Sequence, residues 1–354
     1  TIFIGIELAS TPMFLLSGWK KGDRKSNEGA IKFFLLGVLS ASLILYGFSL
    51  IYGLTGQLVF ADISAYLLAN SLGSSPVLLL SAILVISGIG FKISVVPFHS
   101  WAPDTYEGAP LPITAYLSVS SKATGFVALI VLLTKVFESS GQSWGVILAI
   151  VAGATMTLGN LVALQQTNPV RLLAYSSISQ AGFIIAPLAV SGITGNYQDG
   201  IFASVTYLII YAFMNIGAFL SVHLFTNFTR SDNFYEWGGI AKHSPLTGVL
   251  TTVFFFSLAG IPPLGGWFAK FVVFRSLLST GEIIGISLAI VGAINAVIAL
   301  VYYARISKVI WMDELKNPEE EKSFEFQSPL KVVGALTVLI TFVAGIFPGI
   351  FSYL

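Results

Sequence analysis

Ten long runs of apolar residues follow one another along the chain, separated by shorter segments rich in polar residues, glycine or proline. Each run has roughly the 20 residues with which an α-helix crosses the hydrocarbon core of a bilayer. The pattern therefore predicts an all-α polytopic membrane protein with about ten transmembrane helices. The predicted spans are about residues 1–18, 30–53, 77–98, 112–134, 144–164, 172–190, 200–226, 245–274, 283–304 and 332–353.

Four of the connecting segments have a distinct composition. They are a basic loop at 19–29, a Gly/Ser/Asn loop at 54–76, an aromatic and Pro-rich segment at 97–111, and an acidic loop at 305–331. The acidic loop carries the run MDELKNPEEEKSFE, and charge concentrated in this way is typical of a solvated loop.

The composition and the charge distribution agree with a lipid environment. Of the 354 residues, 55% are hydrophobic and 10% are charged, whereas soluble domains carry about 25% charged residues. Alternating the spans puts Lys135 and Arg275 on one side of the membrane. Thirteen basic residues fall on the other side: Lys20, Lys21, Arg24, Lys25, Lys32, Arg171, Arg230, Lys242, Arg305, Lys308, Lys316, Lys322 and Lys331. By the positive-inside rule we expect this side, with the loop at 305–331, to be cytoplasmic.

Three lysines, Lys92, Lys122 and Lys270, lie inside apolar spans and belong to no loop. A charge at the bilayer centre costs about 2.5–3.5 kcal/mol on insertion scales, so each lysine needs a wet cavity or a polar partner. Glu7 in the first span is a natural partner, because opposite charges stabilise each other at low dielectric. A desolvated lysine can release and rebind a proton, whereas a solvated lysine stays charged. These residues favour an ion path.

Two of the lysines lie beside predicted helix breaks. Lys92 precedes Pro97 by five residues, and Lys270 follows the Gly/Pro cluster GIPPLGG. Proline removes a backbone donor, and broken helices line ion pathways in transporters. The breaks fall in the third and eighth spans, so the two helices run in opposite directions. This spacing predicts two inverted five-helix units.

Other interpretations of these residues stay open at this point. Lys92 and Lys122 could extend their ammonium groups to the membrane interface, and Lys270 could have a purely structural role. Glu7 could be solvated near the start of the sequence. His99, beside the first break, is a candidate proton relay, or alternatively a hydrogen-bond partner for carbonyls that the break frees.

Cysteine is absent, and His223 and His243 are expected at the membrane interface. No two histidines are three or four residues apart, so the chain cannot assemble an iron–sulfur or bis-histidine haem site from its own residues. We therefore expect no metal and no cofactor in this chain, and electron transfer, where it occurs, in another. The net charge of +1 gives no indication of nucleic acid.

Four motifs in this order resemble one known family. They are SNEGAIKFFLLG, GFKISVVPFHSWAPDTYEGAP, QTNPVRLLAYSSISQAGF and SLAGIPPLGGWFAKF. They are similar to the antiporter-like proton-channel subunits of respiratory complex I, the NADH-quinone oxidoreductase, and most similar to the subunit N, or subunit 2, group. The resemblance covers essentially the whole chain, and the wider family includes cation antiporter and membrane hydrogenase subunits.

The resemblance implies a role for each intramembrane charge. Glu7 matches the family's glutamate that pairs with a lysine, here Lys92. Lys122 matches the lysine that connects the two half-channels, and Lys270 matches the terminal lysine of the second. The implied fold is two inverted five-helix units within a family of fourteen helices, joined by a hydrophilic axis at the membrane centre.

The chain departs from the family at two points. Many relatives have histidine where this chain has Gln180, and an amide can form hydrogen bonds but does not carry a proton by titrating. Relay past Gln180 would need water or Ser179. About four N-terminal helices of the full-length family are also missing, so we expect that further residues precede residue 1.

The resulting division of the chain has four parts. Residues 1–134 form an incomplete first unit, 135–304 the second unit, 305–331 a cytoplasmic loop and 332–354 a C-terminal transmembrane helix. We expect a bacterial cytoplasmic membrane, or alternatively a thylakoid membrane, since chloroplast and cyanobacterial relatives have a similar glutamine.

The expected function is proton translocation by a membrane-arm subunit of an NADH- or ferredoxin-driven quinone oxidoreductase. NAD(H) or ferredoxin, FMN, iron–sulfur clusters and quinone would be bound by partner subunits. Two alternatives are a subunit of a sodium/proton antiporter or membrane hydrogenase, and a structural arm subunit that conducts nothing. The desolvation cost of three lysines argues against the last, because a scaffold gains nothing from it.

Overall fold

The computed structural model describes residues 1–314 and 328–353, and the described part is helical and contains no strand. Each of the ten predicted spans coincides with a helix or a broken helix, which confirms the predicted fold class. Among the described residues, eight helical segments are long and apolar enough to cross a membrane, while α1 and the two halves α12 and α13 are shorter. The spans are α1 (Ile2–Ser17), α2 (Arg24–Thr55), α4 (Pro76–Ile93), α6–α7 (Leu111–Lys135), α8 (Gly141–Ala163), α9 (Pro169–Thr194), α10 (Tyr197–Thr229), α12–α13 (Pro245–Ala259 and Gly265–Leu278), α14 (Ile283–Met312) and α15 (Ser328–Ile346).

Several segments predicted as loops contain helix. The Gly/Ser/Asn loop holds α3 (Phe60–Ala69), which at ten residues is too short to cross a bilayer. The Pro-rich segment holds α5 (Trp101–Gly108), and a single helical turn, α11 (Ile240–His243), precedes α12. Apolar periodicity does not detect such short helices, because their stability comes from tertiary packing.

Two predicted loop boundaries are wrong. The basic loop at 19–29 ends early, since α2 begins at Arg24, where the Asp23 carboxylate caps the helix by accepting from the Lys25 amide at 2.9 Å. The loop predicted to begin at residue 305 begins only after Met312, because α14 continues to that residue with its inner face buried. Most of the acidic run, including Lys316 and Lys322, lies outside the described residues.

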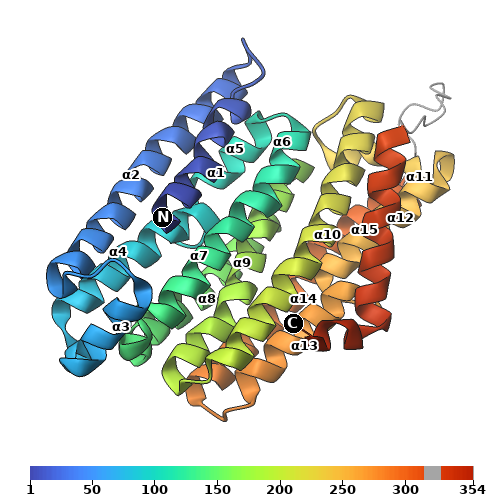
Figure 1. Ribbon diagram of the computed structural model, residues 1–354. Coiled ribbons are helices and arrows are strands. Elements are labelled where there is room, and N and C mark those ends of the chain that lie inside the picture. The colour runs from blue at the N-terminus through green and yellow to red at the C-terminus, as the bar shows by residue number, and fades with distance from the viewer. Residues whose placement is uncertain (315–327, 354) are drawn as a thin grey trace.

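The helices form one bundle in which neighbours mostly run antiparallel (Figure 1). Glycines allow close approach: Ser40 of α2 donates to the Gly88 carbonyl of α4 at 2.7 Å, and Ser81 of α4 donates to the Gly47 carbonyl of α2 at 2.8 Å. Small residues at helix contacts are typical of membrane bundles. Helix α9 lies in the middle of the bundle, and nearly all of its side chains are buried.

The two predicted breaks are present. At the first, α4 ends at Ile93, Ser94 adopts φ +60°, and the chain is irregular until α5. At the second, α12 ends at Ala259 and its C-cap Gly260 has φ +95°, a left-handed conformation that glycine adopts without steric cost. Helix α13 then begins at Gly265. A Cβ at Gly266 would lie 1.7 Å from the Ser257 carbonyl oxygen, so only glycine fits where the two halves meet.

Candidate proton path

The first break holds an ion pair. Lys92, in the last turn of α4, is 3% exposed, and its Nζ lies 3.1 Å from Oε1 of Glu7 on α1. Phe14 and Phe91 lie 5.6 and 6.0 Å from the ammonium group. A cation at a helix C-terminus also faces the negative end of the helix dipole. The structure thus places Glu7 against Lys92 inside the bundle, with Glu7 only partly exposed.

Lys122 lies deeper and contacts α9. Its Nζ donates to the Ser177 carbonyl at 3.0 Å and also contacts the Ser177 hydroxyl. Among the described residues no carboxylate lies within ion-pair distance of it. The π-helical turn Leu117–Ser121 directly precedes Lys122, and such turns are frequent at functional sites.

The π-helical turn is held from α10. The Asn215 side-chain amide donates to the Ser118 hydroxyl at 2.7 Å, and the Tyr211 hydroxyl donates to the Ser118 carbonyl at 3.3 Å. These bonds fix the start of α7 and hence the position of Lys122.

Lys270 binds the carbonyls that the second break leaves free. Its Nζ donates to Ala259 at 2.6 Å and to Leu258 at 3.2 Å, both at the end of α12. The last carbonyls of a helix have no partner within the helix, so a cation can satisfy them. The Phe183 ring on α9 lies 5.2 Å from the ammonium group.

Gln180 connects α9 to this second site. Its Nε2 donates to the Leu258 carbonyl at 3.1 Å, the same oxygen that accepts from Lys270. Its Oε1 accepts from the Tyr207 hydroxyl of α10. Ser177, the partner of Lys122, lies three residues earlier on α9, one turn away. One helix therefore touches the surroundings of both lysines.

Other residues singled out in the sequence lie elsewhere. His99 is half-buried between α4 and α5, and no hydrogen bond of the described residues joins it to a lysine. His223 contacts Asn227 at 3.0 Å near the end of α10, and His243 ends α11. Ser179 lies where α9 packs against Gly159 of α8, away from the contacts of Lys122 and Lys270.

Sequence reasoning missed the residues that join these sites. Ser176, Ser177, Tyr207 and Tyr303 are buried and hydrogen-bonded on α9, α10 and α14. The run of hydroxyl residues in AYSSISQ within an apolar span was the available signal. The sequence carried no signal for the Leu258 carbonyl, because this carbonyl is free only where the helix breaks between α12 and α13.

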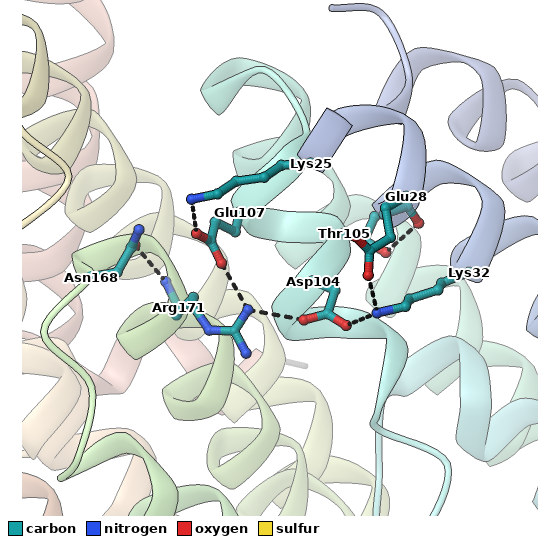
Figure 2. Close-up of polar contacts among 9 residues, drawn as sticks. Lys25, Glu28, Lys32, Asp104, Thr105, Glu107, Asn168 and Arg171 are labelled. Carbon is teal, nitrogen blue, oxygen red and sulfur yellow. Dashed lines mark hydrogen bonds and ion pairs between the residues drawn. The ribbon is translucent and has the colours of Figure 1, made fainter. Parts of the chain in front are cut away.

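A charged cluster joins α2, α5 and α9 at the basic face (Figure 2). Arg171 contacts Asp104 at 2.9 Å and Glu107 at 2.7 Å through one nitrogen, Nη1. Lys32 contacts the other oxygen of Asp104 at 2.7 Å, and Lys25 contacts the other oxygen of Glu107 at 2.7 Å. The cluster ties the start of α9 to the segment that follows the first break.

The cluster favours the ionised form of both α5 carboxyls. Burial by itself raises the pKa of Asp104, but hydrogen bonds and charge from Lys32 and Arg171 outweigh it and hold the pKa below its usual value. Burial opposes ionisation of Glu107 in the same way, and Lys25 and Arg171 again lower its pKa overall. Both groups are therefore anionic at neutral pH.

Comparison with known proteins gives consistent matches. The chain is 42% identical over 354 residues to NAD(P)H-quinone oxidoreductase subunit 2 of Crocosphaera subtropica. The match covers 98% of this chain and 66% of that protein. It is 36% identical to NADH-quinone oxidoreductase subunit N of Heliobacterium modesticaldum, over 99% of this chain and 71% of the relative. The chain thus spans about two thirds of the length of these relatives.

A solved structure and a family description agree with these relatives. A chain of respiratory complex I from Thermus thermophilus superposes with a TM-score of 0.78 at 29% identity, covering 98% of this chain and 73% of that one. Residues 1–298 match the family described as NADH:quinone oxidoreductase/Mrp antiporter, TM. The chain therefore belongs to the NADH:quinone oxidoreductase/Mrp antiporter transmembrane family.

Proposed function

We propose that this chain is a proton-translocating membrane-arm subunit of an NADH- or ferredoxin-driven quinone oxidoreductase. The observation that carries the proposal is that α9 links two of the lysine sites. Its Ser177 accepts a hydrogen bond from Lys122. Its Gln180 donates to the Leu258 carbonyl, to which Lys270 also donates. Buried lysines held by neutral oxygens bear a high desolvation cost, and a proton path accounts for it.

The lysines have different partners and hence different roles. Lys92 pairs with Glu7, so a proton or a moving charge nearby can shift the balance between the ion pair and its separated form. Lys122 and Lys270 are held by hydroxyl and carbonyl oxygens, which accept a hydrogen bond from the charged amine without neutralising it. In this scheme the ion pair loads the path, Lys122 connects its halves, and Lys270 ends it.

The cofactors of the whole enzyme belong to partner subunits in this proposal. NAD(H) or ferredoxin, FMN, iron–sulfur clusters and quinone would be bound there, and this chain would contribute no redox group. The relatives are subunits of quinone oxidoreductases, which favours this function over that of a sodium/proton antiporter or a hydrogenase. A bacterial cytoplasmic or thylakoid membrane fits the cyanobacterial and bacterial relatives.

The inverted-repeat division also remains part of the proposal. Residues 1–134 would form the first unit, and 135–304 the second. Two observations support it: each unit has one helix broken beside a lysine, and α4 runs toward the basic face whereas α12 runs away from it (Figure 1).

The test is Lys122→Met in the assembled complex, with quinone reduction and proton uptake measured in sealed vesicles. We expect proton translocation to fall by about 10²-fold, as for loss of a positioned proton-transfer group. Lys135→Met is the matched control. Lys135 ends the same helix, α7, but is exposed at the face of the bundle opposite the basic cluster. Wild-type reduction and pumping in Lys122→Met would refute the proton path.

A further inference from the structure

Three cations where α1 connects to α2 have no partner in the described part of the chain. Lys20, Lys21 and Arg24, here called the cationic turn, are exposed, and their side chains form no ion pair or hydrogen bond with any described residue. The next two basic residues differ, since Lys25 and Lys32 both form ion pairs. The cationic turn therefore presents charge that the described chain does not neutralise.

The carboxylates near the cationic turn are engaged elsewhere. Asp23 accepts from the backbone amide of Lys25 at 2.9 Å and so caps α2. Glu28, one turn further along α2, pairs with Lys32 at 2.7 Å. Residues 19–24 hold three cations and one carboxylate, so the turn keeps a net positive charge. A positive surface of this kind attracts anions.

A hollow lies beside Arg24 on the first turns of α2. Its volume is about 610 Å³, within the usual range of small-molecule sites. The lining residues are Gly22, Arg24, Asn27, Glu28, Ile31 and Lys32. The hollow thus begins at a free guanidinium group and ends at an apolar side chain.

An exposed apolar ridge continues from this hollow along α2. It consists of Ile31, Leu35 and Val38, which follow Arg24 at spacings of seven, four and three residues and so share one face of the helix with it. The three apolar side chains are 59%, 60% and 47% exposed. Helix α2 lies at the edge of the bundle (Figure 1), and no described helix covers this face.

Trp19 indicates where the membrane surface lies at this turn. Its side chain is 70% exposed, and tryptophan is enriched at the level of the lipid head groups. Because Trp19 directly precedes Lys20, the cationic turn lies at head-group level and the apolar ridge lies below it, at the level of the acyl chains.

We propose that the cationic turn and the apolar ridge together bind one anionic phospholipid of the leaflet at the basic face. The phosphate group lies among the three cations, and an acyl chain follows the ridge. Charge complementarity selects an anionic lipid, because a zwitterionic head group brings a cation of its own to the turn. The site does not depend on the proton path, since lipid binding requires no transfer through the buried lysines.

The test uses the assembled complex in phosphatidylcholine vesicles that contain a trace of photoreactive lipid with a diazirine in its acyl chain. The reactive lipid is phosphatidylglycerol in one sample and phosphatidylcholine with the same chains in the other. After irradiation, labelled chymotryptic peptides of this chain are identified by mass spectrometry. We expect phosphatidylglycerol to label the peptides of the apolar ridge at least about five-fold more, the factor that one basic residue at a membrane surface contributes.

Two triple variants separate this site from general contact with lipid. In Lys20→Gln/Lys21→Gln/Arg24→Gln the two lipids are expected to label the ridge almost equally. The matched control Lys20→Arg/Lys21→Arg/Arg24→Lys keeps the three charges and is expected to keep the excess of phosphatidylglycerol.

Four results would overturn the proposal. They are equal labelling of the wild-type ridge by both lipids, no labelling because a partner protein covers this face, an excess that persists in the uncharged variant, and an excess that inorganic phosphate abolishes at constant ionic strength. The last would assign the cationic turn to free phosphate.

Discussion

Gln180 is a neutral residue at the point where two charged sites meet. Its amide donates to the carbonyl that also holds Lys270, and its oxygen accepts from Tyr207. A titrating side chain here would carry the proton itself, whereas an amide can only orient its neighbours. In the proposed path, transfer past Gln180 would therefore need a neighbouring hydroxyl or water.

Gln180→Leu is predicted to impair both stability and transfer. The Tyr207 hydroxyl would be buried without its acceptor, which costs about 1–3 kcal/mol, and proton translocation is expected to fall at least about 10-fold. Gln180→His is the conservative comparison, since it retains hydrogen bonding and adds a titrating group. Vesicle pumping assays with thermal-shift measurements on the purified complex distinguish the two effects. Normal pumping in Gln180→Leu would exclude a role in transfer.

At the scale of elements, α9 is the helix on which the other parts depend. It meets α7 at Ser177, the end of α12 at Gln180 and α14 at Ser176, and its first turn is tied to α5 by Arg171. Helices α4 and α12–α13 supply the breaks, where unpaired carbonyls give the lysines partners. A displacement of α9 would change the surroundings of Lys122 and Lys270 together.

Arg171→Met is predicted to destabilise the complex by about 1–3 kcal/mol, because two partly buried carboxylates lose a shared charged donor. The exposed Lys20, for which the described residues show no ion pair, provides the control variant Lys20→Met. Equal melting temperatures for the two variants would show that the cluster contributes nothing.

The same cluster predicts a dependence on pH. Asp104 and Glu107 have pKa values below their usual range in the folded protein, so their contribution to stability is complete above a pH of about 4 to 5. It is lost as the pH falls through the lower folded-state values. Asp104→Asn should therefore flatten the acid side of the stability profile. A profile that keeps the wild-type slope would contradict this.

At the scale of the whole molecule, the basic and opposite faces define how the bundle sits in the membrane. Lys25, Lys32 and Arg171 gather at one face (Figure 2), whereas Arg275 lies at the other and pairs with Asp199 at 3.1 Å. The segregation predicted from the sequence is thus reproduced by the arrangement of the helices.

Site-directed labelling can establish this orientation, because the chain has no native cysteine. Lys21→Cys at the basic face and Asn70→Cys at the opposite face are both exposed. In intact cells a membrane-impermeant maleimide is expected to modify Asn70→Cys alone, with Lys21→Cys reacting only after permeabilisation. The reverse pattern would show that the basic face is outside.

The sequence by itself determined the ten spans, the gathering of basic residues at one face, the positions of both breaks and the identity of the buried lysines. These follow from local properties, since span length, Gly/Pro clusters and charge are read over one or two dozen residues. It could not define α3 or α5, whose stability depends on packing, nor the true ends of α2 and α14.

Only the tertiary structure decided which buried polar groups meet. Asn160 and Asn295 are 135 residues apart, Lys122 and Ser177 are 55 apart, and the Leu258 carbonyl is available only because α12 ends beside it. A polar residue in an apolar span signals that it must find a partner. Helix packing selects that partner, and here it places α9 between the lysines, with Gln180 and Tyr207 at the junction.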